Sequence, residues 1–155
     1  MRGTSESVRR RRAELTRGLV DEDEDAEAAP ADRAYWERKA TRETVAIADT
    51  LLSYANDTDG DLELKYNKFY IGLTRKGQPF NVVTFRPRKN HLLLGLRLPQ
   101  TDEMTDRINT IGLEAPEYDR RESAYRLRVA ARDVEKEQDE LAELMALAIR
   151  LRENQ

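Results

Sequence analysis

Four short segments between residues 62 and 98 alternate apolar and polar side chains, and turn-forming residues separate them. Alternation with a period of two is typical of strands that bury one face. Parallel strands need crossover connections of about a dozen residues or more, which are longer than the gaps between these segments. The segments therefore predict an antiparallel meander with strands at 62–66, 69–74, 80–85 and 91–98.

Helical patterns lie on both sides of this meander. Apolar residues recur at three- and four-residue spacing in a first helix, which ends at Tyr54 and begins at Thr41 or as early as Asp32. A second helix begins after Thr101, whose hydroxyl suits an N-cap, and stops at Gly112, the residue type most common just past a helix end.

The last third of the chain adds one strand and one helix. Residues 125–129 alternate apolar side chains with arginines, and residues 133–152 carry an apolar stripe of helical period. We therefore predict a single α+β domain over residues 32–155. Its sheet is antiparallel and five-stranded, the element order is α-β-β-β-β-α-β-α, and the helices lie mainly on one face.

Residues 1–31 have a different character. An arginine block at 9–12 precedes an acidic block that begins at Asp21, and large apolar residues are few. Such segments cannot bury enough surface to offset the entropy of the ordered chain. We predict a disordered charged tail, in which the arginine block either contacts nucleic acid or is solvated beside the acidic block.

Composition excludes several classes of function. The chain has no cysteine, which rules out disulfides, thiolate metal sites and cysteine nucleophiles and fits a cytoplasmic protein. His91 is the only histidine, so no multi-histidine metal site exists, and we predict no cofactor. No apolar run is long enough to span a membrane, and the N-terminus lacks the apolar region of a signal peptide.

The charge of the meander is the main functional signal. Residues 62–98 hold eight basic residues against one acid, Glu63, and so carry +7 within a chain of net charge −3. Alternation places most of these side chains opposite the apolar face, where they suit phosphate groups. The predicted sites for nucleic acid or another polyanion are Lys65, Lys68, Tyr70, Arg86, Arg88, Lys89, Arg97, Arg126 and Arg128. The alternative is a solvated face balanced by acidic helices.

Two other functions remain open at this point. Glu63 and Lys65 form an E-x-K pair on one strand face, as in metal-dependent nucleases, with the acidic turn 57–61 as a source of further ligands. In this alternative Glu63 and Lys65 are catalytic. The apolar stripe at 141–151 instead favours a protein-interaction module, with a partner protein or a second copy of the chain on the C-terminal helix.

The meander also resembles a known family. Tyr66, Lys68, Tyr70, Ile71 and Gly72 match a Y-x-K-x-Y-I-G core, and residues 81–89 resemble an F-x-x-x-R-P-[RK]-K segment. Over residues 36–151 the chain is similar to the bacterial and archaeal family called domain of unknown function 5655, sometimes labelled "predicted transport protein". The resemblance implies a compact α+β domain that is often appended to other proteins, and it supplies no catalytic residues. The family's W-G-x-G-like motif before the last strand is replaced here by YDRRESAYRLRV.

Overall fold

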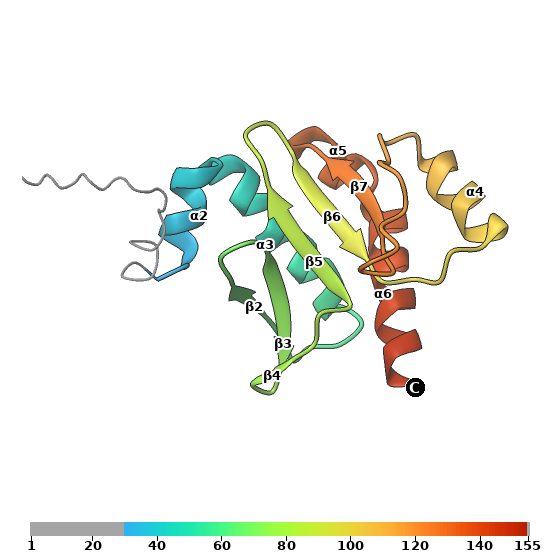
Figure 1. Ribbon diagram of the computed structural model, residues 1–155, viewed down its shortest axis with the longest axis horizontal. Helices are drawn as coiled ribbons and strands as arrows, with labels where there is room; N and C mark the ends of the chain where they lie inside the picture. Colours follow the sequence, from blue (N-terminus) through green and yellow to red (C-terminus); the bar gives the residue numbers. More distant parts are fainter. Residues whose placement is uncertain (1–29, 155) are drawn as a thin grey trace, which may run out of the picture. The chain divides into compact units, whose positions relative to one another are not determined.

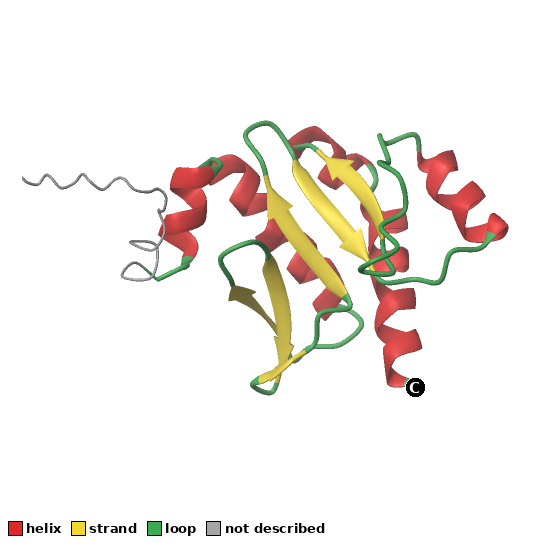
Figure 2. Ribbon diagram, viewed as in Figure 1, coloured by secondary structure: helices red, strands yellow, loops and turns green. Residues whose placement is uncertain are grey.

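The computed structural model describes residues 30–154 (Figures 1 and 2). Every helix and strand named here belongs to the unit Arg33–Gln155. In chain order the elements are α2 (Arg33–Lys39), α3 (Arg42–Asn56), β2 (Leu62–Tyr66), β3 (Ile71–Arg75), β4 (Gln78–Pro79), β5 (Val83–Pro87), β6 (Leu92–Leu96), α4 (Asp102–Ile111), β7 (Tyr125–Val129), α5 (Ala131–Lys136) and α6 (Gln138–Glu153). Apart from Pro30 and Ala31, the predicted charged tail at 1–31 lies outside the described residues.

The sheet is antiparallel throughout, in the order β2-β3-β5-β6-β7, with the short β4 paired to β3. The prediction of an α+β fold with an antiparallel sheet is confirmed. The third strand begins later than predicted, because Lys76 and Gly77 form a tight turn with φ of 53° and 82° that returns the chain as β4. Residues 80–82 then lead irregularly into β5.

One face of the sheet forms the core. Ile71, Phe85, Leu94 and Leu127 stand side by side across four strands and are fully buried. Helices α3 and α6 pack on this face (Figure 1). Helix α4 lies beside α6, to which Arg107 ties it through Glu140 and Glu143, at 2.7 and 2.6 Å. In the described part of the chain, the opposite face of the sheet carries no helix (Figure 2). We call it the open face.

The helix ends follow the capping signals. The Thr41 hydroxyl accepts a hydrogen bond from the Thr44 amide at the start of α3. Thr101 caps α4 in the same way, and Gly112 ends α4 in the left-handed conformation, with φ of 88°. The first predicted helix is in fact two, because the chain leaves helical geometry at Thr41 before α3 begins. Among the described residues, no helix is long and apolar enough to cross a membrane.

The helix predicted at 133–152 is broken at Glu137 into α5 and α6. The Tyr54 hydroxyl of α3 donates to the Val134 carbonyl oxygen, at 3.2 Å. In an unbroken helix that oxygen accepts from the amide four residues later, that is, from Gln138 at the start of α6. The contact with Tyr54 holds α5 against α3, and α6 continues along the core after the break.

The second strand was predicted to begin at Phe69, where alternation puts the ring on the core face with Ile71, and this prediction is wrong. The Asn67 amide donates to the Tyr70 carbonyl oxygen, at 3.0 Å, and closes a turn over Asn67–Tyr70. Pairing of β2 with β3 therefore starts at Tyr66 and Ile71. Phe69 lies at the tip of the turn with 71% of its surface exposed.

Candidate anion-binding site

Three arginines stand together on the open face. Arg86 of β5 lies opposite Leu93 of β6, which lies opposite Arg128 of β7. Arg126 lies on the same face as Arg128, two residues earlier, and opposite Gly95. Directly opposed residues of antiparallel strands share a face. The strands therefore bring the three guanidinium groups into one region, separated only by one leucine and one glycine.

Small residues let neighbouring side chains lie flat on this face. A Cβ added at Gly72 would lie 2.2 Å from Asn81 Oδ1 and 3.0 Å from Tyr70 Cε2, so both side chains rest directly on the Gly72 backbone. Asn81 Oδ1 also accepts from the Leu73 amide, at 3.1 Å. The Arg86 guanidinium carbon lies 5.6 Å from the centre of the Tyr70 ring, within the range of a cation–π contact.

Beside the three arginines the surface is hollowed. We call this the basic hollow, a space of about 530 Å³ lined by Arg88, Lys89, Asn90, His91, Leu93, Pro116, Arg126 and Arg128. The β5–β6 turn supplies the first four, and a hydrogen bond from the Arg88 amide to the His91 carbonyl oxygen closes it, at 2.7 Å. Four of the lining side chains are cationic and none is a carboxylate, so the hollow favours anions.

The arginines of β7 are only partly neutralised. Arg128 Nε lies 3.6 Å from Glu114 Oε2, but both side chains are well exposed, and such surface ion pairs contribute about 0–1 kcal/mol. Arg126 Nη2 donates to the Glu117 carbonyl oxygen, at 3.0 Å. Arg126 Nε is buried and has no hydrogen-bond partner among residues 30–154. The exposed Arg128 guanidinium therefore keeps donors that an anion can use, while Arg126 contributes its positive charge.

His91 stands between these charges. Burial lowers the pKa of His91 below its usual value of 6.5, and the positive charges of Arg128 and Arg88 lower it further, while Glu114 acts in the opposite direction. The imidazole is therefore neutral near pH 7 and adds a hydrogen-bonding group rather than a charge.

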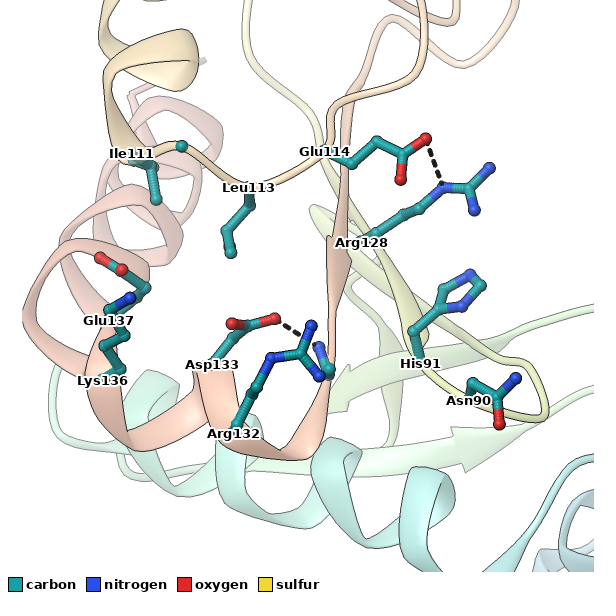
Figure 3. A pocket seen from close by; sticks show the side chains of 12 residues that line it. Asn90, His91, Ile111, Leu113, Glu114, Arg128, Arg132, Asp133, Lys136 and Glu137 are labelled. Atoms are coloured by element: carbon teal, nitrogen blue, oxygen red, sulfur yellow. Dashed lines mark hydrogen bonds and ion pairs between the residues drawn. The ribbon is translucent and has the colours of Figure 1, made fainter.

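Figure 3 shows a second hollow, which shares Asn90, His91 and Arg128 with the basic hollow. It has a volume of about 600 Å³, and α5 and the segment after α4 form most of its wall. Its cations are matched by carboxylates, and one of these, Asp133, accepts from the Ala130 amide at 2.9 Å. This second hollow has balanced charge, so it does not select anions as the basic hollow does.

The structure brings most of the predicted residues together. Arg88, Lys89, Arg126 and Arg128 line the basic hollow, and Tyr70 and Arg86 adjoin it across the sheet. Lys65 projects from the same face on the edge strand β2, opposite Gly72, and Lys68 lies in the β2–β3 turn. Arg97 is apart from them, because it forms an ion pair with Glu122 at 2.7 Å and lines a different hollow.

Among residues 30–154, the acidic turn does not complete a metal site of the kind a metal-dependent nuclease uses around Glu63 and Lys65. Asp59 binds Arg75 at 2.6 Å, and Arg75 faces the helices, since it lies opposite Leu62 and reaches Glu153 of α6. Within the described residues, no group of three or more His, Asp or Glu side chains is arranged to hold a metal ion.

The apolar stripe of the C-terminal helix is occupied by the chain itself. Leu141, Leu144, Met145 and Ala148 are buried in the core. Leu151 alone among the large residues of that stripe is exposed, at 39%. The helix therefore offers a partner protein little apolar surface of its own.

Sequence reasoning missed four residues that line the basic hollow: Asn90, His91, Leu93 and Pro116. His91 and Leu93 line the basic hollow, and alternation around the buried Leu92 and Leu94 was a usable signal for both. Pro116 reaches the hollow because the Arg128 amide donates to the Glu114 carbonyl oxygen, at 2.9 Å, which draws the preceding loop along β7. No local sequence pattern predicts this hydrogen bond between Arg128 and Glu114.

Comparisons with known proteins identify no relative of this chain. No family model matches the chain, and no curated protein or solved structure matches it significantly. The resemblance to domain of unknown function 5655 stays a prediction.

Proposed function

We propose that this protein is an accessory module that binds nucleic acid, or another phosphate-like polyanion, through the basic hollow and the adjoining open face. The observation that carries the proposal is the convergence of four cationic side chains from a turn and a strand on a hollow that no carboxylate side chain lines. Solvated charges on a sheet face need no such convergence.

The chemistry of the lining suits phosphate. Arginine presents a planar fork of donors that matches two phosphate oxygens, and lysine adds a mobile point charge. Arg126 and Arg128 stand on a paired strand, with a carbonyl oxygen fixing Arg126, so their positions are set before a ligand arrives. Arg88 and Lys89 are exposed on the turn and can adjust to the ligand. A rigid wall and an adaptable rim together suit a backbone of repeating phosphates.

Salt dependence gives the first test. Each phosphate that the protein neutralises releases counterions, so the logarithm of the binding constant falls with the logarithm of salt concentration by about 0.7–0.9 per contact. We would measure fluorescence anisotropy of labelled single-stranded DNA, duplex DNA and RNA between about 50 and 200 mM salt, with heparin as a competitor.

The double variant Arg88→Ala/Lys89→Ala should weaken binding and lower the salt slope by about one to two units. The matched control is Arg120→Ala/Arg121→Ala, which removes the same charge from exposed neighbouring residues near the other end of β7. If both double variants weaken binding equally, net charge alone explains the affinity. If wild-type protein binds none of these polyanions at low salt, the proposal is wrong.

A further inference from the structure

We infer that the nucleic acid bound at the basic hollow is single-stranded, and that Phe69 is the side chain on which one of its bases stacks. The inference rests on the proposed function and names the class of ligand for the same site. Phe69 is 71% exposed, and Leu151 is the only other large apolar side chain exposed among residues 30–154. Exposed aromatic rings of this kind are what single-strand-binding surfaces use, because every base has a face that can stack.

The ring is exposed on a well-held turn. The Trp36 indole donates to the Asn67 carbonyl oxygen at 2.9 Å, and the Tyr35 hydroxyl donates to the Lys68 carbonyl oxygen at 3.2 Å. Trp36 itself is fully buried. Helix α2 therefore fixes the turn backbone that leads into the ring. The exposure of Phe69 is thus a property of the folded state, and less order is lost when a ligand contacts a ring already in place.

The strand directions place Phe69 at the same end of the sheet as the basic hollow. Strand β2 runs toward the Phe69 turn, and β5, which is parallel to β2, runs toward the turn that holds Arg88 and Lys89. From β3 to β7 there are three strand spacings, or about 14 Å. A stacked single strand advances about 3.4 Å per nucleotide, so about four nucleotides cover this distance.

Basic side chains lie between Phe69 and the basic hollow. Lys68 Nζ lies 5.6 Å from the centre of the Phe69 ring, and Arg86 lies over Tyr70 between the turn and the hollow. A base that stacks on Phe69 therefore brings its own phosphate near Lys68 and the following phosphates toward Arg86 and the basic hollow. A base inside a duplex already has neighbours on both faces and cannot stack on the ring without leaving the helix, which makes the site selective for single strands.

The test uses the full chain with a labelled oligothymidylate of about 12 nucleotides and a duplex of equal length. Phe69→Ala and Phe69→Leu should each bind the single strand roughly 5- to 150-fold more weakly, the range expected for one stacked base. Phe69→Trp should keep the affinity, and the fluorescence of the new indole should fall on binding. Leu151→Ala is the control, since it removes the other exposed apolar side chain, and it should change nothing.

The outcomes separate this inference from the proposed function. If the wild type binds neither nucleic acid nor heparin at low salt, both are wrong, and if it binds heparin but no nucleic acid, only the stacking inference is wrong. The stacking inference alone is overturned by any of three results. The wild type binds the duplex as tightly as the single strand, or Phe69→Leu binds the single strand as tightly as the wild type does. The third is that Phe69→Ala weakens the binding of heparin as much as the binding of the oligonucleotide. In the last case Phe69 serves as an apolar contact for some other partner. Circular dichroism on each variant confirms that the fold is retained.

Discussion

Replacing Gly72 by alanine should destabilise the protein through one identifiable side chain, Asn81. The new Cβ would lie 2.2 Å from Asn81 Oδ1, so the amide group must move. That oxygen accepts from the Leu73 amide, and Leu73 is fully buried. A buried donor without a partner costs about 1–3 kcal/mol, and crowding of this kind costs about 1–3 kcal/mol. Alanine also lowers the conformational entropy of the unfolded chain, which stabilises the folded state by about 0.4–1 kcal/mol and offsets part of this loss. The expected net loss is about 3 kcal/mol, and at least about 1 kcal/mol.

A double-mutant cycle isolates this mechanism. Asn81→Ala alone leaves the Leu73 amide without its acceptor and should cost about 1–3 kcal/mol. In that background the amide group that the new Cβ would strike is absent, so adding Gly72→Ala should cost less than about 1 kcal/mol. The two changes are then coupled by about 2 kcal/mol.

The assay is urea unfolding followed by the fluorescence of Trp36, the only tryptophan in the chain, which is buried in the folded state. Gly60→Ala is the matched control, since the nearest atom to its Cβ is 4.0 Å away, and it should be nearly neutral. Penalties at Gly72 and Asn81 that add to within about 0.5 kcal/mol would refute the reasoning, because independent sites behave in that way.

Two further predictions concern the core face and the basic hollow. Leu94→Ala should lower the free energy of unfolding by about 2–5 kcal/mol, because Leu94 is fully buried in the core. In the same urea titration, Leu93→Ala on the open face should lower it clearly less. Equal losses would mean that the two faces are misassigned. Burial, Arg128 and Arg88 lower the pKa of His91 in the folded state, so its contribution to stability is complete above the usual value of 6.5 and is lost as the pH falls below it. His91→Gln should remove this pH dependence from the unfolding free energy, and a variant with the wild-type profile would contradict the assignment.

Local patterns predicted those parts of the fold that local chemistry determines. Thr101 and Gly112 marked the ends of α4 because a cap hydroxyl and a left-handed glycine act on their own helix. Phe69 was misplaced because alternation continues through a turn that only a backbone hydrogen bond, from Asn67 to Tyr70, reveals. The break at Glu137 was not predicted either, and the Val134 carbonyl oxygen just before it accepts from Tyr54 of a helix distant in the sequence.

The same distinction holds for the candidate site. Arg126 and Arg128 were assigned correctly to one face because strand alternation determines it. That they meet Arg88 and Lys89 in one hollow depends on β7 pairing with β6, which is far from it in the sequence. Alternation along the strand also assigns Arg97 to the open face. Its guanidinium group nevertheless lies away from the basic hollow, in an ion pair with Glu122. Alternation in the sequence predicts on which face of the sheet a side chain lies. Where it lies on that face depends on the tertiary structure.

The pairing of β6 with β7 also has a consequence during synthesis. Strands β2 to β6 follow one another closely and can pair as soon as they emerge from the ribosome, whereas β7 comes only after α4 and a long loop. Until residues 125–129 have emerged, β6, with the sequence LLLGL, is an unprotected edge that is rich in leucine. Such an edge can recruit a β6 strand from a neighbouring nascent chain. We therefore expect a chain cut between β6 and β7 to aggregate.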